Sequence, residues 1–279
     1  MTATAFVLIL AAAALHAAWN SLVKMSGDAL VTATLIMGVS GLVGLPGLFL
    51  LPLPAPASWP VLGFSLIVHG AYIFFLLQPY RHGNFGQVYP IARGTAPLIL
   101  ATFAFVAVGE RLSPTSTAAV VAISVGIVSL ALSGGAVLGR DLRPVLFALA
   151  TAVFIASYTL LDGIGARAAG SPHSYAVWLF VLHGVSIVLL AWLFRRGVFI
   201  ALARKQWRRG LAAGIMGIAA YWIVIWALSI GTMAQVAALR ETSVVFAAVI
   251  GSLVLKESFG RFRIAAAALV AAGIVLLQV

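Results

Sequence analysis

The sequence predicts an all-α polytopic membrane protein with ten transmembrane helices. Hydrophobic residues make up 63% of its 279 residues and charged residues only 8%, whereas about a quarter of the residues in a soluble domain are charged. The apolar residues are gathered in runs of roughly 18–25 residues. Each run is long enough to cross the ~30 Å hydrocarbon core of a bilayer as a helix.

Each expected helix is bounded by a break in the apolar sequence. The first run has no Lys or Arg before it and is long for the apolar part of a signal sequence, so we expect a retained span. Prolines and glycines at 52–56, 133–135 and 170–172 mark turns. The basic segment 195–209 is expected as a loop. The expected spans are about 2–23, 30–51, 60–80, 84–108, 115–134, 144–162, 174–194, 210–229, 232–255 and 261–278.

The basic residues predict the orientation of the chain. Of the 17 Lys and Arg residues, Arg93 and Arg240 lie inside expected spans, and all but two of the others fall in loops on one side. The positive-inside rule puts these loops in the cytoplasm and both termini on the opposite side of the membrane. The net charge of +11 does not indicate nucleic-acid binding, because the basic residues form no stripe on a soluble face.

The second half of the chain repeats the first. Residues 83–88 match residues 231–236 at an offset of 148, and the Gly-Ile-Val sequence at 126–128 recurs at 273–275 at an offset of 147. Because five spans are an odd number, the second copy enters the membrane from the opposite side. This predicts an inverted repeat whose substrate site lies near the midplane between the halves. The two expected five-helix halves are 1–135 and 136–279.

Three sequence features then resemble a known family. They are the Gly-Glu-Arg-Leu-Ser turn at 109–113, its echo Lys-Glu-Ser-Phe at 256–259, and Ala-Ala-Trp-Asn at 17–20 in the first span. Together with the two halves they resemble the drug/metabolite transporter superfamily, its EamA-type ten-helix branch, and most of all the YddG-type amino-acid exporters of bacterial inner membranes. The resemblance implies a multi-pass protein of that membrane, a central cavity lined by spans 1, 3, 4, 6, 8 and 9, and export of amino acids or related metabolites. In that membrane, the count of basic residues puts both termini in the periplasm.

The fourth span carries an uncompensated arginine at membrane depth. Such a charge is expensive and marks either a functional site or a paired structural one. Tyr89, Arg93 and Pro97 share one helical face at i, i+4 and i+8, and Pro90 and Pro97 are expected to kink the helix. Glu241 lies at a similar depth in the ninth span.

Two interpretations of these charges remain open. In the structural one, Arg93, Arg240 and Glu241 form a buried ion-pair network between the halves. In the functional one, Arg93 receives a substrate carboxylate and Glu241 its ammonium group. The two are compatible if substrate exchange breaks the pair.

Other polar and aromatic residues fall within the spans and are candidates for the cavity wall. For each of them, interhelical hydrogen bonding or core packing is the alternative. As a group, the aromatic rings favour a small, partly apolar zwitterion over a polyanion. The remaining acids, Asp162 included, are expected at span ends or in loops, and His183 is expected to pack in the core. The candidate cavity residues, beside the charges, are His16, Trp19, Asn20, His69, Tyr72, Tyr89, Tyr158, Tyr221 and Trp222.

Some functions are not supported by any motif. The chain has no cysteine, and no His pair with metal-ligand spacing, so we expect no metal site. No phosphate-binding loop or catalytic constellation is present, so we expect neither a cofactor nor an enzyme. The first span also lacks the membrane-embedded Glu of the small multidrug relatives, which puts cation antiport by that mechanism in doubt.

The fifth and tenth spans carry ridges of small residues, suited to helix packing or to self-association. These ridges comprise Ala118, Ala122, Gly126, Ala268, Ala272 and Gly273.

The sequence thus predicts a secondary exporter of aromatic, neutral and similar small zwitterionic amino acids that works by alternating access. The expected partners are the small-molecule substrate and the lipid bilayer. Two alternatives remain: another small metabolite or a cationic drug as cargo on the same fold, or a membrane enzyme or scaffold without transport.

Overall fold

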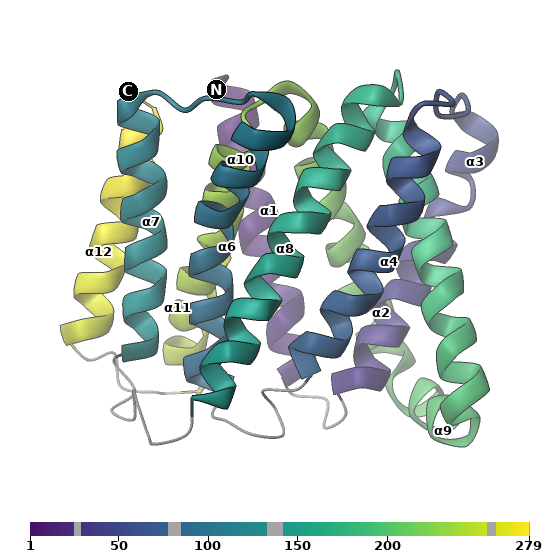
Figure 1. Ribbon diagram of the computed structural model, residues 1–279. Helices are drawn as coiled ribbons and strands as arrows, with labels where there is room; N and C mark the ends of the chain where they lie inside the picture. The colour runs from purple at the N-terminus through teal and green to yellow at the C-terminus, as the bar shows by residue number, and fades with distance from the viewer. Residues whose placement is uncertain (25–28, 78–84, 133–141, 256–260, 279) are drawn as a thin grey trace.

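The computed structural model describes residues 1–24, 29–77, 85–132, 142–255 and 261–278, and within these ranges every regular element is a helix. The helices run side by side as a bundle, and α1 begins at the same end of the bundle at which α12 finishes (Figure 1). The elements are α1 (Ala3–Lys24), α2 (Ala29–Gly44), α3 (Gly47–Leu50), α4 (Ser58–Leu77), α6 (Phe85–Val108), α7 (Pro114–Leu132), α8 (Arg143–Ala168), α9 (Pro172–Ile230), α10 (Met233–Glu241), α11 (Ser243–Leu255) and α12 (Arg261–Leu276).

Among the described residues, 7 helical segments are long and apolar enough to cross a membrane. They coincide with seven of the ten expected spans, and two shorter apolar helices, at Thr34–Leu50 and Phe262–Leu276, coincide with two more. The chain is therefore a polytopic membrane protein. Ten crossings stay a prediction. The seven segments are Ala3–Leu22, Ser58–Phe75, Tyr89–Val108, Pro114–Ala131, Arg143–Ala168, Pro172–Leu193 and Ala203–Ile230.

The expected loop at 195–209 is wrong, because this segment is helical and belongs to the 59-residue helix α9. Both ends of α9 nevertheless contact α2: a Cβ on Gly41 would lie 3.2 Å from the Cα of Gly184, and a Cβ on Gly214 would lie 3.1 Å from the carbonyl oxygen of Ile36. Thirty residues of straight helix would span about 45 Å. The helix must therefore turn back between its two apolar parts, as its ribbon does in Figure 1.

Two expected spans are interrupted. The second expected span breaks between α2 and α3, and Pro46 lies just before α3. Proline has no backbone N–H to continue the hydrogen bonds of a helix. The ninth breaks at Thr242, between α10 and α11, and the Thr242 hydroxyl donates to the Leu239 carbonyl at 2.6 Å. The break at Thr242 leaves Arg240 and Glu241 at the end of the short helix α10.

Helices α8 and α6 can also be compared with the expected spans. Helix α8 continues to Ala168, beyond the expected end at 162, so Asp162 lies inside the helix. Helix α6 runs unbroken through Pro90 and Pro97, both buried, and kinks there stay a prediction. It ends before Gly109, whose φ of +69° is the left-handed conformation that favours glycine after a helix.

Helices α7 and α12 pack against each other through a reciprocal contact. A Cβ on Gly126 would lie 3.0 Å from the carbonyl oxygen of Ala266, and a Cβ on Gly273 would lie 2.9 Å from that of Ala119. Positions 126 and 273 are 147 apart, as are 119 and 266. Each contact therefore maps onto the other at the offset found in the sequence, which is the pattern of two segments related by a two-fold axis.

A second reciprocal contact joins α2 to the first part of α9. A Cβ on Gly41 would lie 3.2 Å from the carbonyl oxygen of Phe180, and a Cβ on Gly184 would lie 2.7 Å from that of Met37. Here both pairs of equivalent positions, 41 with 184 and 37 with 180, are 143 apart. The same kind of exchange thus occurs at two separate places in the bundle.

The glycines of the two small-residue ridges are used in packing within the chain. Gly126 and Gly273 are buried between α7 and α12, whereas Ala118, Ala268 and Ala272 are exposed on the outside of these helices. Self-association through that outer surface stays a prediction.

We predict that Gly126→Leu destabilises the protein by about 1–3 kcal/mol, because the new side chain would overpack the α7–α12 contact. Thermal unfolding of the purified protein in detergent measures the effect as a lower midpoint. The matched control is Gly63→Leu on α4, where an added Cβ meets nothing within 4 Å. Equal midpoints for the two variants would contradict the assigned contact.

Candidate functional site

The centre of the candidate site is one carboxylate shared by two arginines. The Nε atom of Arg93, from α6, forms an ion pair with Oε2 of Glu241, at the end of α10. The guanidinium of Arg240 donates to Oε1 of the same carboxylate from Nε at 3.2 Å and from Nη2 at 2.9 Å. The two arginines are 3% exposed and Glu241 is fully buried. Glu241 therefore connects a charge from the first half of the chain to a charge from the second.

Helix α1 contacts this cluster through His16. Nη2 of Arg93 donates to Nε2 of His16 at 3.0 Å, so the imidazole accepts there as a neutral ring. Trp19 packs edge-on against His16 at 4.9 Å, and its buried indole N–H has no hydrogen-bond partner in the described part of the chain. Asn20, in contrast, donates to the His16 carbonyl of its own helix. Buried donors are nearly always paired, so the Trp19 N–H is a donor that a ligand could use.

Aromatic rings from four helices surround the two arginines. The Arg93 guanidinium carbon lies 5.7 Å from the Tyr89 ring centre, and that of Arg240 lies 6.0 Å from Tyr158 and 5.9 Å from Tyr221. These distances suit cation–π attraction. Tyr72 of α4 then packs edge-on against Tyr158 at 5.4 Å. The structure thus brings together most of the residues that the sequence assigned to a cavity.

Trp222 contacts the start of α9, and its place in a cavity wall stays a prediction. Its indole N–H donates to Nδ1 of His173 at 2.8 Å, and its ring lies 6.1 Å from that of Phe180. Both partners lie near the start of α9, at Pro172. The contacts of Trp222 are therefore with that end of α9, whereas the neighbouring Tyr221 reaches the arginines.

Asp162 is the buried charge that sequence reasoning missed. Its carboxylate is fully buried in α8 and accepts hydrogen bonds from the hydroxyls of Ser65 at 2.5 Å, Tyr221 at 2.5 Å and Tyr175 at 3.1 Å. Nε2 of His69 lies 3.8 Å from its second oxygen. The signal available in the sequence was the Gly-Ile-Gly-Ala run that follows Asp162, which extends the apolar segment past it.

Tyr221 joins the two charged groups into one network, since its hydroxyl donates to Asp162 and its ring lies beside Arg240. The network holds two arginines and two carboxylates, so its formal charges cancel. Charged groups at membrane depth are stable only when they are compensated in this way. A ligand that enters the network must therefore preserve the balance, as a zwitterion does.

A second ion pair closes one end of the bundle. Arg167, near the end of α8, donates to Oε2 of Glu110 at 3.1 Å and to the carbonyls of Leu228 and Gly231 at 3.0 and 2.7 Å. Glu110 also accepts from the backbone N–H of Met233 at 2.5 Å. The Arg167–Glu110 pair thus provides hydrogen-bond partners for backbone carbonyls at the end of α9 and for a backbone N–H at the start of α10. The echo of the Glu110 turn, at 256–259, lies outside the described residues.

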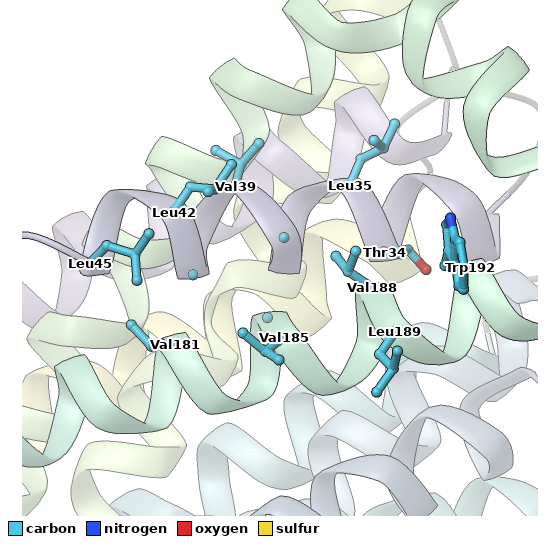
Figure 2. A pocket seen from close by; sticks show the side chains of 13 residues that line it. Thr34, Leu35, Val39, Leu42, Leu45, Val181, Val185, Val188, Leu189 and Trp192 are labelled. Atoms are coloured by element: carbon cyan, nitrogen blue, oxygen red, sulfur yellow. The ribbon is translucent and has the colours of Figure 1, made fainter. Parts of the chain in front are cut away.

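An apolar groove lies apart from the charged network, between α2 and the first part of α9 (Figure 2). Its volume is about 490 Å³, and its side chains are apolar except for that of Thr34 and the indole N–H of Trp192. Its lining includes none of the predicted cavity residues. The groove is lined by Thr34, Leu35, Gly38, Val39, Gly41, Leu42, Leu45, Val181, Gly184, Val185, Val188, Leu189 and Trp192.

The described residues contain no group of three His, Cys, Asp or Glu side chains placed to hold a metal ion. Substrate binding by the predicted residues stays a prediction, because the geometry describes only their contacts with one another.

Comparison with known families found a match in the second part of the chain. Residues 142–279 match the model of the EamA-like transporter family. A search of curated proteins found no match. A solved structure titled "Crystal structure of protein" aligns with 100% of this chain and 97% of its own at 20% identity, with a TM-score of 0.80. At that identity the likeness shows the fold alone.

We predict that Glu241→Gln destabilises the protein more than Arg240→Met. The first change leaves two buried arginines facing a neutral side chain, and breaking a buried pair in this way costs about 3–5 kcal/mol. The second leaves Arg93 and Glu241 paired one to one, and the Asp162 carboxylate, which loses Arg240, keeps its three hydroxyl donors. Thermal unfolding in detergent ranks the variants, and an Arg240→Met midpoint at or below that of Glu241→Gln would contradict the shared carboxylate.

Proposed function

We propose that this chain, whose residues 142–279 match the model of the EamA-like transporter family, is a secondary transporter that exports amino acids across a bacterial inner membrane. The observation that carries the proposal is the buried Arg93–Glu241–Arg240 cluster at the break between α10 and α11. Broken helices at membrane depth are typical of transporter binding sites, because their ends present unpaired backbone groups and charges to a substrate.

The chemistry of the cluster matches a zwitterion. A guanidinium binds a carboxylate through two parallel hydrogen bonds, so Arg93 receives the substrate carboxylate, assisted by the unpaired N–H of Trp19. Glu241 receives the ammonium group. The substrate then replaces the internal ion pair, and the charges of the network remain balanced before and after binding.

The rings of the network suit aromatic and neutral side chains. Tyr72, Tyr89, Tyr158 and Tyr221 supply apolar faces around the charges, and such faces pack well against aromatic and aliphatic groups. A cationic drug is the less favoured cargo, because two of the three charged groups in the central cluster are positive and repel it.

Alternating access follows from an inverted repeat of the two halves. The reciprocal glycine contacts support this proposal: Gly126 of α7 packs against α12, and Gly41 of α2 packs against the first part of α9. Each contact joins a helix to its equivalent in the other half of the proposed ten-helix arrangement. The Arg167–Glu110 pair holds one end of the bundle together, and exchange between the two access states requires it to break.

We predict that Arg93→Ala and Glu241→Ala each reduce amino-acid transport by the purified protein in liposomes to the level of empty liposomes, because each removes one of the two charges that the zwitterion needs. Arg93→Lys keeps the charge but loses the planar fork, so it should retain a reduced flux. The matched control is Arg111→Ala, whose guanidinium lies over Phe105 outside the network.

Unchanged flux in both alanine variants would remove these residues from the site. Competition of labelled amino acid with unlabelled amino acids, other metabolites and cationic drugs identifies the cargo in the same assay. Inhibition by the last two groups alone would favour the alternative cargo.

We predict that both termini are periplasmic, as the distribution of basic residues requires. The chain has no cysteine, so single cysteines can be labelled without background. Thr2→Cys should react with a membrane-impermeant maleimide in intact spheroplasts, whereas Arg208→Cys in the basic part of α9 should react only after lysis. The reverse pattern would overturn the orientation.

A further inference from the structure

The proposed function leaves one buried group without a role. Asp162 lies outside the central cluster, yet its carboxylate is fully buried and accepts from three hydroxyls on two other helices. Ser65 belongs to α4, and Tyr175 and Tyr221 belong to the two arms of α9. Hydroxyl donors stabilise a carboxylate but do not neutralise it, so the charge still has to be compensated at membrane depth.

The nearest histidine, His69, directs a nitrogen without a hydrogen toward this carboxylate and makes no hydrogen bond to it. Nδ1 of His69 lies 3.0 Å from the Ser65 carbonyl oxygen, which can only accept, so the ring proton sits on Nδ1. The hydroxyl hydrogen of Ser65 is used on Asp162, so its oxygen also acts as an acceptor toward Nδ1 at 3.2 Å. The neutral ring therefore carries no proton on Nε2.

Nε2 of His69 lies 3.8 Å from the Oδ2 atom of Asp162. A lone pair of the imidazole and a lone pair of the carboxylate thus face each other across this distance. One added proton, on either group, replaces this repulsion with an attraction, which becomes a hydrogen bond when the two atoms approach to about 3 Å. The pair is therefore built to take up a single proton.

The groups that face the pair explain how this proton affects substrate binding. Tyr158 of α8 stacks on His69 at 4.2 Å, and His183 of α9 lies 5.0 Å from it. Arg240 of α10 lies beside Tyr221, which donates to Asp162. Without the added proton, Asp162 helps to compensate Arg240, and the network is neutral. With it, the network carries one extra positive charge.

We propose that Asp162 and His69 form the binding site of a coupling proton, so that export of the zwitterion is driven by proton entry. This inference rests on the proposed transport function. Protonation of the pair leaves Arg240 with Glu241 as its only carboxylate partner in the network, which withdraws Glu241 from the substrate ammonium group. The extra positive charge repels that ammonium group as well. Proton and substrate binding therefore oppose each other, as proton antiport requires.

Transport by the purified protein in liposomes tests the coupling. With an acidic lumen, the wild-type protein should accumulate labelled amino acid above the outside concentration. Asp162→Asn and His69→Gln should lose this accumulation to the level without a gradient. Because Asp162→Asn has the charge balance of the protonated pair, it should also exchange labelled for unlabelled amino acid several-fold more slowly at low substrate concentration, whereas Asp162→Glu should keep both activities. The matched control is Thr159→Val, since the Thr159 hydroxyl, one turn away, donates only to its own helix at Ile155; it should keep both activities.

Infrared difference spectra of the protein between about pH 8 and pH 5 test the proton site without transport. The wild type should gain a carboxylic-acid or imidazolium band that is lost in Asp162→Asn and restored in Asp162→Glu. Gradient-driven accumulation that survives in Asp162→Asn, or an unchanged band in that variant, overturns the proton site. Absence of any amino-acid exchange by the wild type, with the band present and lost in Asp162→Asn, overturns the transport function and leaves the proton site supported.

Discussion

The shared carboxylate of Glu241 is the interaction on which the rest of the structure depends. Two guanidinium groups at membrane depth, Arg93 and Arg240, must be compensated inside the protein, because hydrocarbon offers them no counter-charge. Glu241 compensates both, and it does so from the last residue of α10, where its side chain and that of Arg240 are buried in the bundle. The helices that surround this point supply rings and hydroxyls in place of water.

The same cluster explains why the site is suited to exchange as well as to stability. In the proposed mechanism, a zwitterion replaces the internal ion pair and keeps the charges balanced in both states, so that no lone charge is exposed to hydrocarbon. The reciprocal glycine contacts of Gly126 with α12 and of Gly41 with α9 are consistent with the proposed inverted repeat. Two arrangements of similar energy are what alternating access needs.

Sequence reasoning predicted the parts of this structure that follow from length, periodicity and charge. Runs of apolar residues predicted the spanning helices, and the depth of Arg93 and Glu241 in two repeated spans predicted their proximity. It failed where tertiary contacts decide: the basic segment 195–209 is helical because α9 continues through it, and Asp162 is internal because α8 runs past its apolar core to Ala168. The helix face on which Trp222 lies could not be predicted, because the face of a uniformly apolar helix cannot be read from periodicity.

The central claim is that substrate binds by replacing Arg93 as the partner of Glu241. The most direct measurement is a structure of the protein in lipid with its transported amino acid bound. The account predicts the substrate carboxylate within hydrogen-bond distance of Arg93, its ammonium group on Glu241, and separation of Arg93 from Glu241. A substrate bound elsewhere, with the Arg93–Glu241 ion pair intact, would contradict it.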